Sequence, residues 1–171
     1  LRIVFTTMII FISLSFFSPL LEARGLRDVD RKKWKIYIDP RQNPSECWAD
    51  AEPYKIIRNG RSVFQHRDDM HLHTSFVPSE NVIGQVGVVS KHKFKRGASI
   101  ELIIGSEKFK LEPVGNHALP KSVSEDKKVV RALKKGSIAI LKVTNPNGLI
   151  SEYMFSLGGY TAATNAAASK C

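Results

Sequence analysis

Short apolar runs separated by polar turns recur along most of the chain. Residues 34–38, Trp-Lys-Ile-Tyr-Ile, alternate apolar and polar positions, which predicts a half-buried strand with Trp34, Ile36 and Ile38 on one side. Further extended segments are predicted at residues 46–51, 71–77, 82–90, 99–105, 107–114, 137–143 and 149–157. Because runs spaced by about 8 to 12 residues are typical of all-β folds, the pattern predicts a mainly β domain, an antiparallel sandwich or barrel with one or two short helices.

One segment between these runs has helical periodicity. Ser124 is expected to cap its start, and the two acidic residues that follow suit the positive end of the helix dipole. Lys134-Lys135-Gly136 gives a basic last turn and a stop. The apolar stripe of this helix consists of Val129, Val130 and Leu133. Residues 160–170 are rich in alanine, which predicts a second short helix.

The first 23 residues differ in character from the rest of the chain. An apolar run from Ile3 to Phe17 is broken by Ser18-Pro19, and small residues suit a cleavage site at Ala23. This arrangement predicts a secretory signal cleaved after Ala23. The alternative is an uncleaved membrane anchor, because residues 3–21 approach the roughly 20 apolar residues that a spanning helix needs. A flexible charged leader at 24–33 and a single domain at 34–171 are expected to follow.

The chain is strongly basic, with a formal net charge of +10. Loss of residues 1–23 would not change this value, because Arg2 and Glu22 cancel. A positive field favours anionic partners, such as lipopolysaccharide phosphates, acidic phospholipid headgroups or sulfated host glycans. The alternative is a solvated surface that keeps the protein soluble. The candidate binding residues form two clusters, Lys91, Lys93, Lys95 and Arg96 in one, and Lys127, Arg131, Lys134 and Lys135 along the predicted helix, opposite Val130 and Leu133.

The chain has two cysteines, Cys47 and Cys171. Exported proteins meet an oxidising environment, so these two residues are predicted to form a disulfide. A bond that closes a loop of this length contributes about 4 to 5 kcal/mol in the chain-entropy model. The alternative is a reactive or intermolecular thiol, although the sequence has no Cys-x-x-Cys motif.

Motifs of known chemistry are scarce. The sequence has no Gly-x-Ser-x-Gly, His-Glu-x-x-His, Walker-type or Gly-x-Gly-x-x-Gly motif, which predicts a protein without catalytic residues or a cofactor. A periplasmic hydrolase with a cryptic site is the alternative. The aromatic residues are too scattered for a nucleic-acid stacking surface, so nucleic acid is not an expected partner.

The histidines offer one further hypothesis. His71 and His73 are two apart on a predicted strand and therefore share a face, where His66 could join them to bind Zn²⁺ or Cu²⁺. A specific metal site usually needs a third or fourth ligand. The competing interpretation is a pair of surface histidines on the solvent side of a strand whose Leu72 faces the core.

Several segments resemble the invasion-associated locus B family of exported proteins in Gram-negative bacteria. The resemblance covers residues 34–171 and is carried by Asn-Pro-Ser-Glu-Cys-Trp-Ala at 43–49, the segment 99–111, the helix ending at 137, and Phe-Ser-Leu-Gly-Gly-Tyr-Thr-Ala-Ala at 155–163 with the final Cys171. It implies a mainly β fold, export to the periplasm or beyond, and a role in host-cell invasion or the cell envelope. It supplies no catalytic residues, and residues 66–76 depart from it by their histidines and charges.

Overall fold

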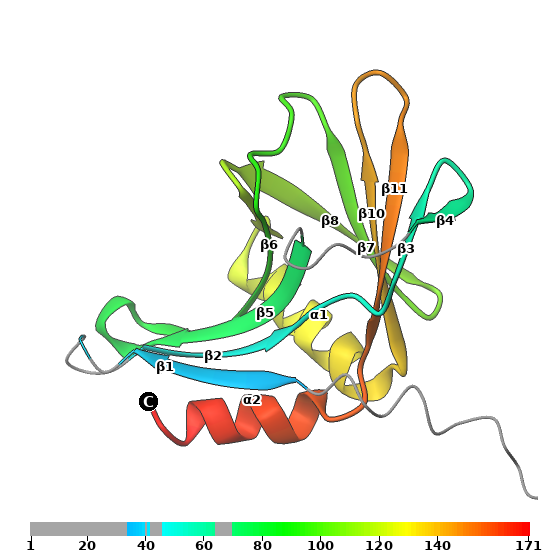
Figure 1. Ribbon diagram of the computed structural model, residues 1–171. Helices are drawn as coiled ribbons and strands as arrows, with labels where there is room; N and C mark the ends of the chain where they lie inside the picture. The colour runs from blue at the N-terminus through cyan, green and yellow to red at the C-terminus, as the bar shows by residue number, and fades with distance from the viewer. Residues whose placement is uncertain (1–33, 40, 42–45, 64–69) are drawn as a thin grey trace, which may run out of the picture.

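The structure is a computed structural model that describes residues 34–39, 41, 46–63 and 70–171. The predicted signal or anchor and the charged leader lie outside these residues. The described residues form eleven strands and two α-helices (Figure 1). The strands are β1 (Lys35–Asp39), β2 (Glu46–Ala51), β3 (Lys55–Arg58), β4 (Arg61–Val63), β5 (Met70–Val77), β6 (Val82–Ser90), β7 (Ser99–Ile104), β8 (Glu107–Val114), β9 (His117–Pro120), β10 (Ile138–Thr144) and β11 (Ile150–Ser156). The helices are α1 (Val123–Lys135) and α2 (Tyr160–Ala168), and a 3₁₀ turn, η2, spans Pro78–Glu80.

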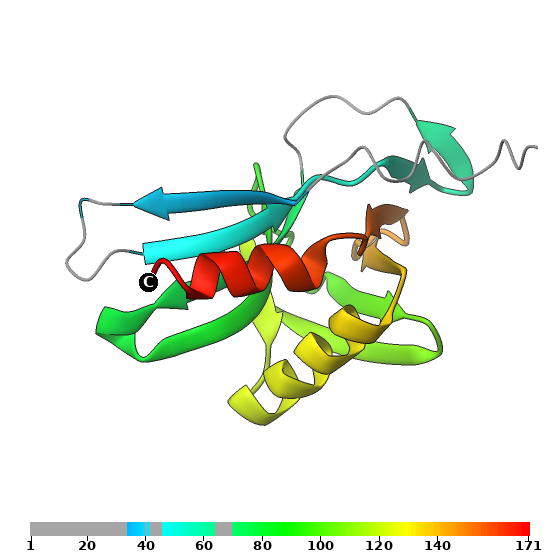
Figure 2. The same ribbon diagram turned by 90° about the horizontal axis from the view of Figure 1, so that it is seen from below.

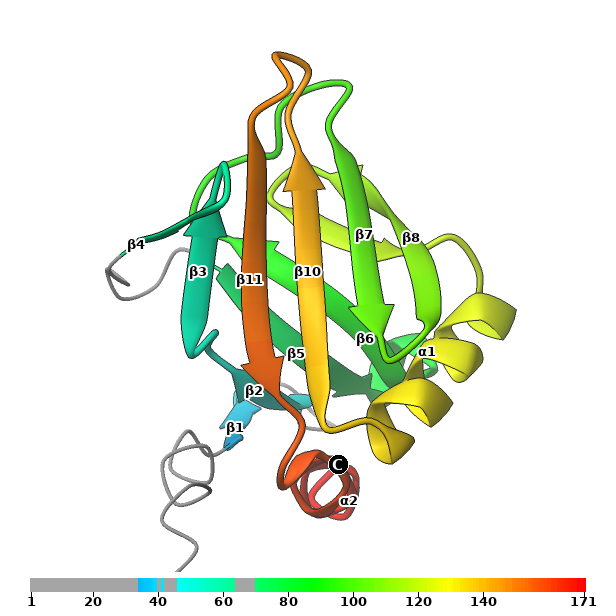
Figure 3. The ribbon, with the colours of Figure 1, turned by 90° about the vertical axis from the view of Figure 1, so that its right-hand side faces the viewer.

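All strands belong to one antiparallel sheet with the order β1-β2-β5-β6-β9-β8-β7-β10-β11-β3-β4. The sheet curls on itself, so that β3, β11, β10, β7 and β8 lie in front of β2, β5 and β6 in Figure 3. Among the described strands, β1 and β4 form its two edges, and the sheet therefore remains open. This architecture confirms the prediction of a mainly β, single-domain protein with two short helices.

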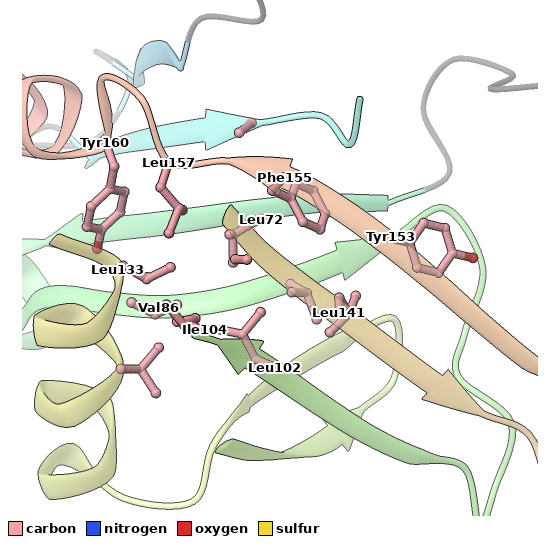
Figure 4. Packing of buried hydrophobic residues seen from close by; sticks show 14 of the residues in the cluster. Leu72, Val86, Leu102, Ile104, Leu133, Leu141, Tyr153, Phe155, Leu157 and Tyr160 are labelled. Atoms are coloured by element: carbon pink, nitrogen blue, oxygen red, sulfur yellow. The ribbon is translucent and has the colours of Figure 1, made fainter. Parts of the chain in front are cut away.

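The core fills the space inside the curled sheet. In β10 the residues alternate between buried and partly buried positions, and the buried ones include Ala139, Leu141 and Val143. The same period-2 pattern in β5 and β7 places Leu72 and Leu102 on the inner face, fully buried. Figure 4 shows Leu133 of α1 and Tyr160 of α2 beside side chains from the strands. The two helices therefore close the end of the core that the sheet leaves open.

Helix α1 begins two residues earlier than the sequence predicted. Its N-cap is Ser122, whose Oγ accepts a hydrogen bond from the Glu125 backbone N–H at 3.3 Å, whereas Ser124 lies inside the first turn. Ser122 and Glu125 have the Ser-x-x-Glu spacing of a capping box, which favours this start over the later one. The buried residues of α1 are Val129, Ala132 and Leu133, and Val130 is only partly buried.

The prediction of a half-buried strand at residues 34–38 is wrong for two of its three apolar residues. Trp34 is buried, and its Nε1–H donates to the backbone oxygen of Ser156 at 3.1 Å. Ile36 and Ile38 on β1 are 40% and 43% exposed. β1 is an edge strand, and the hollow beside Ile36 is lined by alanines of α2 and by the two glycines that precede this helix, which are too short to cover Ile36.

The C-terminus is fixed to the sheet covalently. Cys47 on β2 is fully buried and forms a disulfide with Cys171, with a Cα–Cα distance of 6.0 Å. Helix α2, which precedes Cys171, lies alongside β1 and β2 (Figure 2). At its other end, Tyr160 makes an edge-to-face contact with Trp34, with the ring centroids 4.9 Å apart. No helix within the described ranges has the length and apolar content needed to cross a membrane.

Candidate functional site: a groove between the two helices

A groove lies between α1 and α2, with β5 and β6 as its floor. The helices diverge from the C-terminal end of α1 toward its N-terminal end, as Figure 2 shows. The cavity between them has a volume of about 420 Å³. Its lining comprises Thr74, Phe76, Ile83, Gly84, Val123, Asp126, Lys127, Val130, Arg131, Lys134, Tyr160, Thr164, Asn165 and Ala168. Two consecutive strands and two helices that are distant from them in the sequence therefore contribute to one site.

The deepest part of the groove is held by buried hydrogen bonds. The hydroxyl oxygens of Thr74 on β5 and Tyr160 on α2 are 3.1 Å apart, and both residues are almost fully buried. Burial raises the pKa of Tyr160 to about 12, although the hydrogen bond to Thr74 acts in the opposite direction. The Thr164 hydroxyl donates to the Tyr160 backbone oxygen at 2.9 Å. Each of these hydroxyl groups has a hydrogen-bond partner within the protein, so the floor of the groove is polar but its polar atoms are already paired.

Asp126 fixes α1 to the sheet. Its Oδ1 accepts a hydrogen bond from the backbone N–H of Val86 on β6 at 2.8 Å. Burial raises the pKa of this carboxyl above its ordinary value, and the hydrogen bond from Val86 offsets part of that effect. Asp126 therefore positions the helix at the groove and places one negative charge in the wall.

The rest of the α1 wall is basic. Lys127, Arg131 and Lys134, here called the basic wall, are exposed and line the cavity. Within the described part of the chain, none of the three forms an ion pair. One detail of the sequence prediction is corrected by this arrangement. Val130 lies on the same side of α1 as the basic wall, not opposite it, because it is three residues after Lys127 and four before Lys134. Lys135, which was predicted for the same stripe, is exposed and does not line the cavity.

The open end of the groove carries exposed apolar side chains. Ile83 on β6 is 86% exposed and Val123 in the first turn of α1 is 72% exposed, and these two residues are called the apolar rim. Both also line a second cavity of about 520 Å³ on the neighbouring surface, together with Asp126 and Lys127. Sequence reasoning missed the apolar rim, because Ile83 lies in an apolar run that predicts a buried strand. Val123 and Val130 are seven residues apart on the basic side of α1, and this spacing was the available signal.

The second basic cluster lies elsewhere. Lys91, Lys93, Lys95 and Arg96 are exposed in the loop between β6 and β7. This loop and α1 are at opposite ends of the molecule in Figures 1 and 3. Phe94, in the same loop, is partly buried against the core, and its backbone N–H donates to Gly115 at 2.9 Å. The structure therefore does not join the two predicted clusters into one surface.

His71 and His73 share the outer face of β5, as predicted, while Leu72 faces the core. His71 Nδ1 is 2.9 Å from Asp50 Oδ2, and the His73 ring is in edge-to-face contact with His117, with the centroids 6.0 Å apart. The interpretation of two open surface histidines is wrong for His73. Its Nδ1 atom is buried, without a hydrogen-bond partner among the described residues, and burial lowers its pKa to about 4.

The predicted metal ligands do not form a complete site in the described residues. His66 lies outside those residues, so its position relative to His71 and His73 is not described. Within residues 34–39, 41, 46–63 and 70–171, no group of three or more His, Cys, Asp or Glu side chains is placed to hold a metal ion. The groove between α1 and α2 is therefore the stronger candidate for a binding site.

Comparison with known proteins relates the fold to one solved structure. The chain is similar to invasion associated protein B from Bartonella henselae, with a TM-score of 0.51 and 18% sequence identity. The similarity covers 81% of this chain and 93% of the other. No protein-family model matches the sequence, and no curated protein sequence matches it. At this identity the likeness shows the fold alone. The disulfide by itself fits an extracytoplasmic protein, because disulfides persist in oxidising compartments.

Proposed function

We propose that this protein is an exported, non-enzymatic binding protein of the invasion-associated locus B type, which attaches to anionic components of the cell envelope or of a host-cell surface. The observation that carries the proposal is the basic wall, in which Lys127, Arg131 and Lys134 line one cavity without an acidic partner in the described residues. The lining holds three cations and one carboxylate, Asp126, so the groove is net positive, and a cleft with an excess of one charge concentrates the opposite charge. The basic wall therefore attracts an anionic group toward the groove.

Two further observations support this proposal. The net charge of +10 gives the whole molecule a positive field, which speeds encounters with anionic surfaces. The fold is similar to that of a protein whose name associates it with invasion, and the disulfide suits export to an oxidising compartment. The protein would then act outside the cytoplasm, where anionic lipids and glycans are abundant.

The experiment measures retention on heparin and on anionic phospholipid vesicles as the salt concentration rises. The wild-type protein is expected to bind at low salt and to be released between roughly 0.15 and 0.5 M salt, because exposed charges are screened. The test variant replaces Lys127, Arg131 and Lys134 with Glu. The matched control replaces Lys91, Lys93 and Lys95 with Glu, which changes the net charge equally at the opposite end of the molecule.

The α1 variant is expected to lose more retention than the loop variant. Equal losses would show that net charge alone governs binding and that the groove has no special role. Flow-through of the wild-type protein at low salt would overturn the proposed function.

A further inference from the structure

We propose that the groove binds a single-chain anionic lipid, with the acyl chain between α1 and α2 and the acidic headgroup at Arg131 and Lys134. This inference rests on the proposed function and narrows its ligand from anionic surfaces in general to one lipid molecule. The groove combines an apolar lining with three cations, and an anionic amphiphile has both matching parts.

The size and lining of the groove suit one acyl chain. A volume of about 420 Å³ falls within the range of roughly 300 to 1,000 Å³ that is usual for small-molecule sites. Such sites are mostly apolar, with a few polar groups that fix orientation. The apolar part of this lining comes from all four elements, through Phe76, Ile83, Val130 and Ala168.

The charges along α1 set the direction of the ligand. Val123 and Asp126 lie in the first turn of α1, whereas Arg131 and Lys134 lie toward its C-terminal end. Asp126 offsets the charge of its neighbour Lys127, so a carboxylate or phosphate gains less at that end, whereas Arg131 and Lys134 attract it away from the acidic first turn. The acidic headgroup is therefore expected at the narrow end of the groove, and the chain extends toward the apolar rim.

The apolar rim distinguishes a lipid from a sulfated glycan or free phosphate. Ile83 and Val123 are among the most exposed large apolar side chains of the described residues, and both lie at the same groove. Covering them with hydrocarbon removes apolar surface from water, which favours binding. A glycan or a phosphate ion has no hydrocarbon chain to cover them. Charge explains the attraction of any anion, and the apolar rim adds a preference for an amphiphile.

The test compares three soluble probes by isothermal titration calorimetry with the full mature protein. Dodecyl phosphate, used below its micelle-forming concentration, carries both parts of the ligand. Inorganic phosphate carries only the head, and dodecyl maltoside carries the chain on an uncharged head. Dodecyl phosphate is expected to bind at least about tenfold more tightly than inorganic phosphate, because burial of two methylene groups suffices for that factor. It should also bind more tightly than dodecyl maltoside, which has the same chain but no charge for Arg131 and Lys134 to attract.

The variant pair Ile83→Gln and Val123→Gln tests the apolar rim. Both side chains are exposed, so the double variant is expected to keep the stability of the wild-type protein. It should weaken dodecyl phosphate binding by about tenfold or more and leave retention on heparin unchanged. Val114→Gln is the matched control, since Val114 is 64% exposed on β8 and does not line the groove.

The outcomes separate this inference from the proposed function. Equal affinities for dodecyl phosphate and inorganic phosphate, or an unchanged dodecyl phosphate affinity in the double variant, would overturn the lipid inference and leave anionic binding intact. A double variant that loses binding to anionic vesicles but not to dodecyl phosphate would mean that the apolar rim inserts into a bilayer, which also overturns it. Failure of the wild-type protein to bind heparin or vesicles concerns the proposed function instead.

Discussion

The hydroxyl groups of Thr74 and Tyr160 meet at 3.1 Å in the interior, 86 residues apart in the sequence. Thr74 belongs to β5 and Tyr160 is the first residue of α2, so this contact fixes the C-terminal helix to the middle of the sheet. It also forms the floor of the groove. Packing of the tail and the shape of the binding site therefore depend on the same pair.

Tyr160→Phe is expected to lower the free energy of unfolding by about 1 to 3 kcal/mol, because it leaves the Thr74 hydroxyl buried without its partner. Urea denaturation followed by circular dichroism measures the change. Addition of Thr74→Val removes the orphaned hydroxyl, so the double variant should lose less than the sum of the two single variants. Additive losses would show that the two hydroxyls do not interact. Tyr37→Phe, at an exposed tyrosine, is the control.

Cys171→Ser is expected to lower the free energy of unfolding by about 2 to 5 kcal/mol, as the removal of native disulfides often does. The physical reason is that the bond joins residues 124 positions apart and so restricts the unfolded chain. The measurement is chemical denaturation of the wild-type protein and the variant without reductant. The wild-type protein, unfolded without reductant, should show no thiol that reacts with Ellman's reagent. Two reactive thiols in protein from its native compartment would contradict the prediction.

His73 is expected to make the protein less stable as the pH falls. Burial lowers its pKa from 6.5 to about 4, so the unfolded state binds a proton at a higher pH than the folded state does. The free energy of unfolding is therefore not reduced by His73 above about pH 6.5. It falls by up to about 3 kcal/mol as the pH drops from 6.5 to 4. Asp50, His71 and His117 face the same ring; the charge of Asp50 opposes the lowering of its pKa, and the other two reinforce it.

Urea denaturation at several pH values from 7 to 4.5 measures this dependence. His73→Phe removes the titrating ring and should make the decline in stability shallower than in the wild-type protein. His92→Phe, at an exposed histidine in the β6–β7 loop, should leave the slope unchanged. If His73→Phe and the wild-type protein had the same slope, the buried ring would not be responsible.

The fold was largely predictable because alternation along a strand is a local property. Each buried position of β10, such as Leu141, follows from its own neighbours in the sequence. The errors arose where two residues offered the same local signal, or where burial depended on a neighbouring element that the sequence does not place. Ser122 and Ser124 are both acceptable caps, and only the spacing from Ser122 to Glu125 decides between them. Ile36 reads as buried, but its exposure depends on the edge position of β1 and the short side chains of α2.

The candidate site was predictable only in part. The cations of α1 recur at helical spacing, so the basic wall could be found from sequence. The part of the groove that the strands form could not be found, because Phe76 and Ile83 become neighbours through pairing of β5 with β6, where the register shifts between Ser75 and Phe76. The opposite wall depends on where α2 packs, which is a tertiary property. His73 likewise reads as a surface residue until the strands around it are placed.

The bond between Cys47 and Cys171 also determines what a protease can do to this protein. Most of the domain lies between the two cysteines, inside a covalent ring that the disulfide closes. A single cut at an exposed turn, such as the one at Gly148 between β10 and β11, opens the ring without releasing a fragment. The two pieces of the nicked protein would stay joined by the disulfide until it is reduced. Strands β10 and β11, on either side of the cut, would therefore remain paired in the sheet.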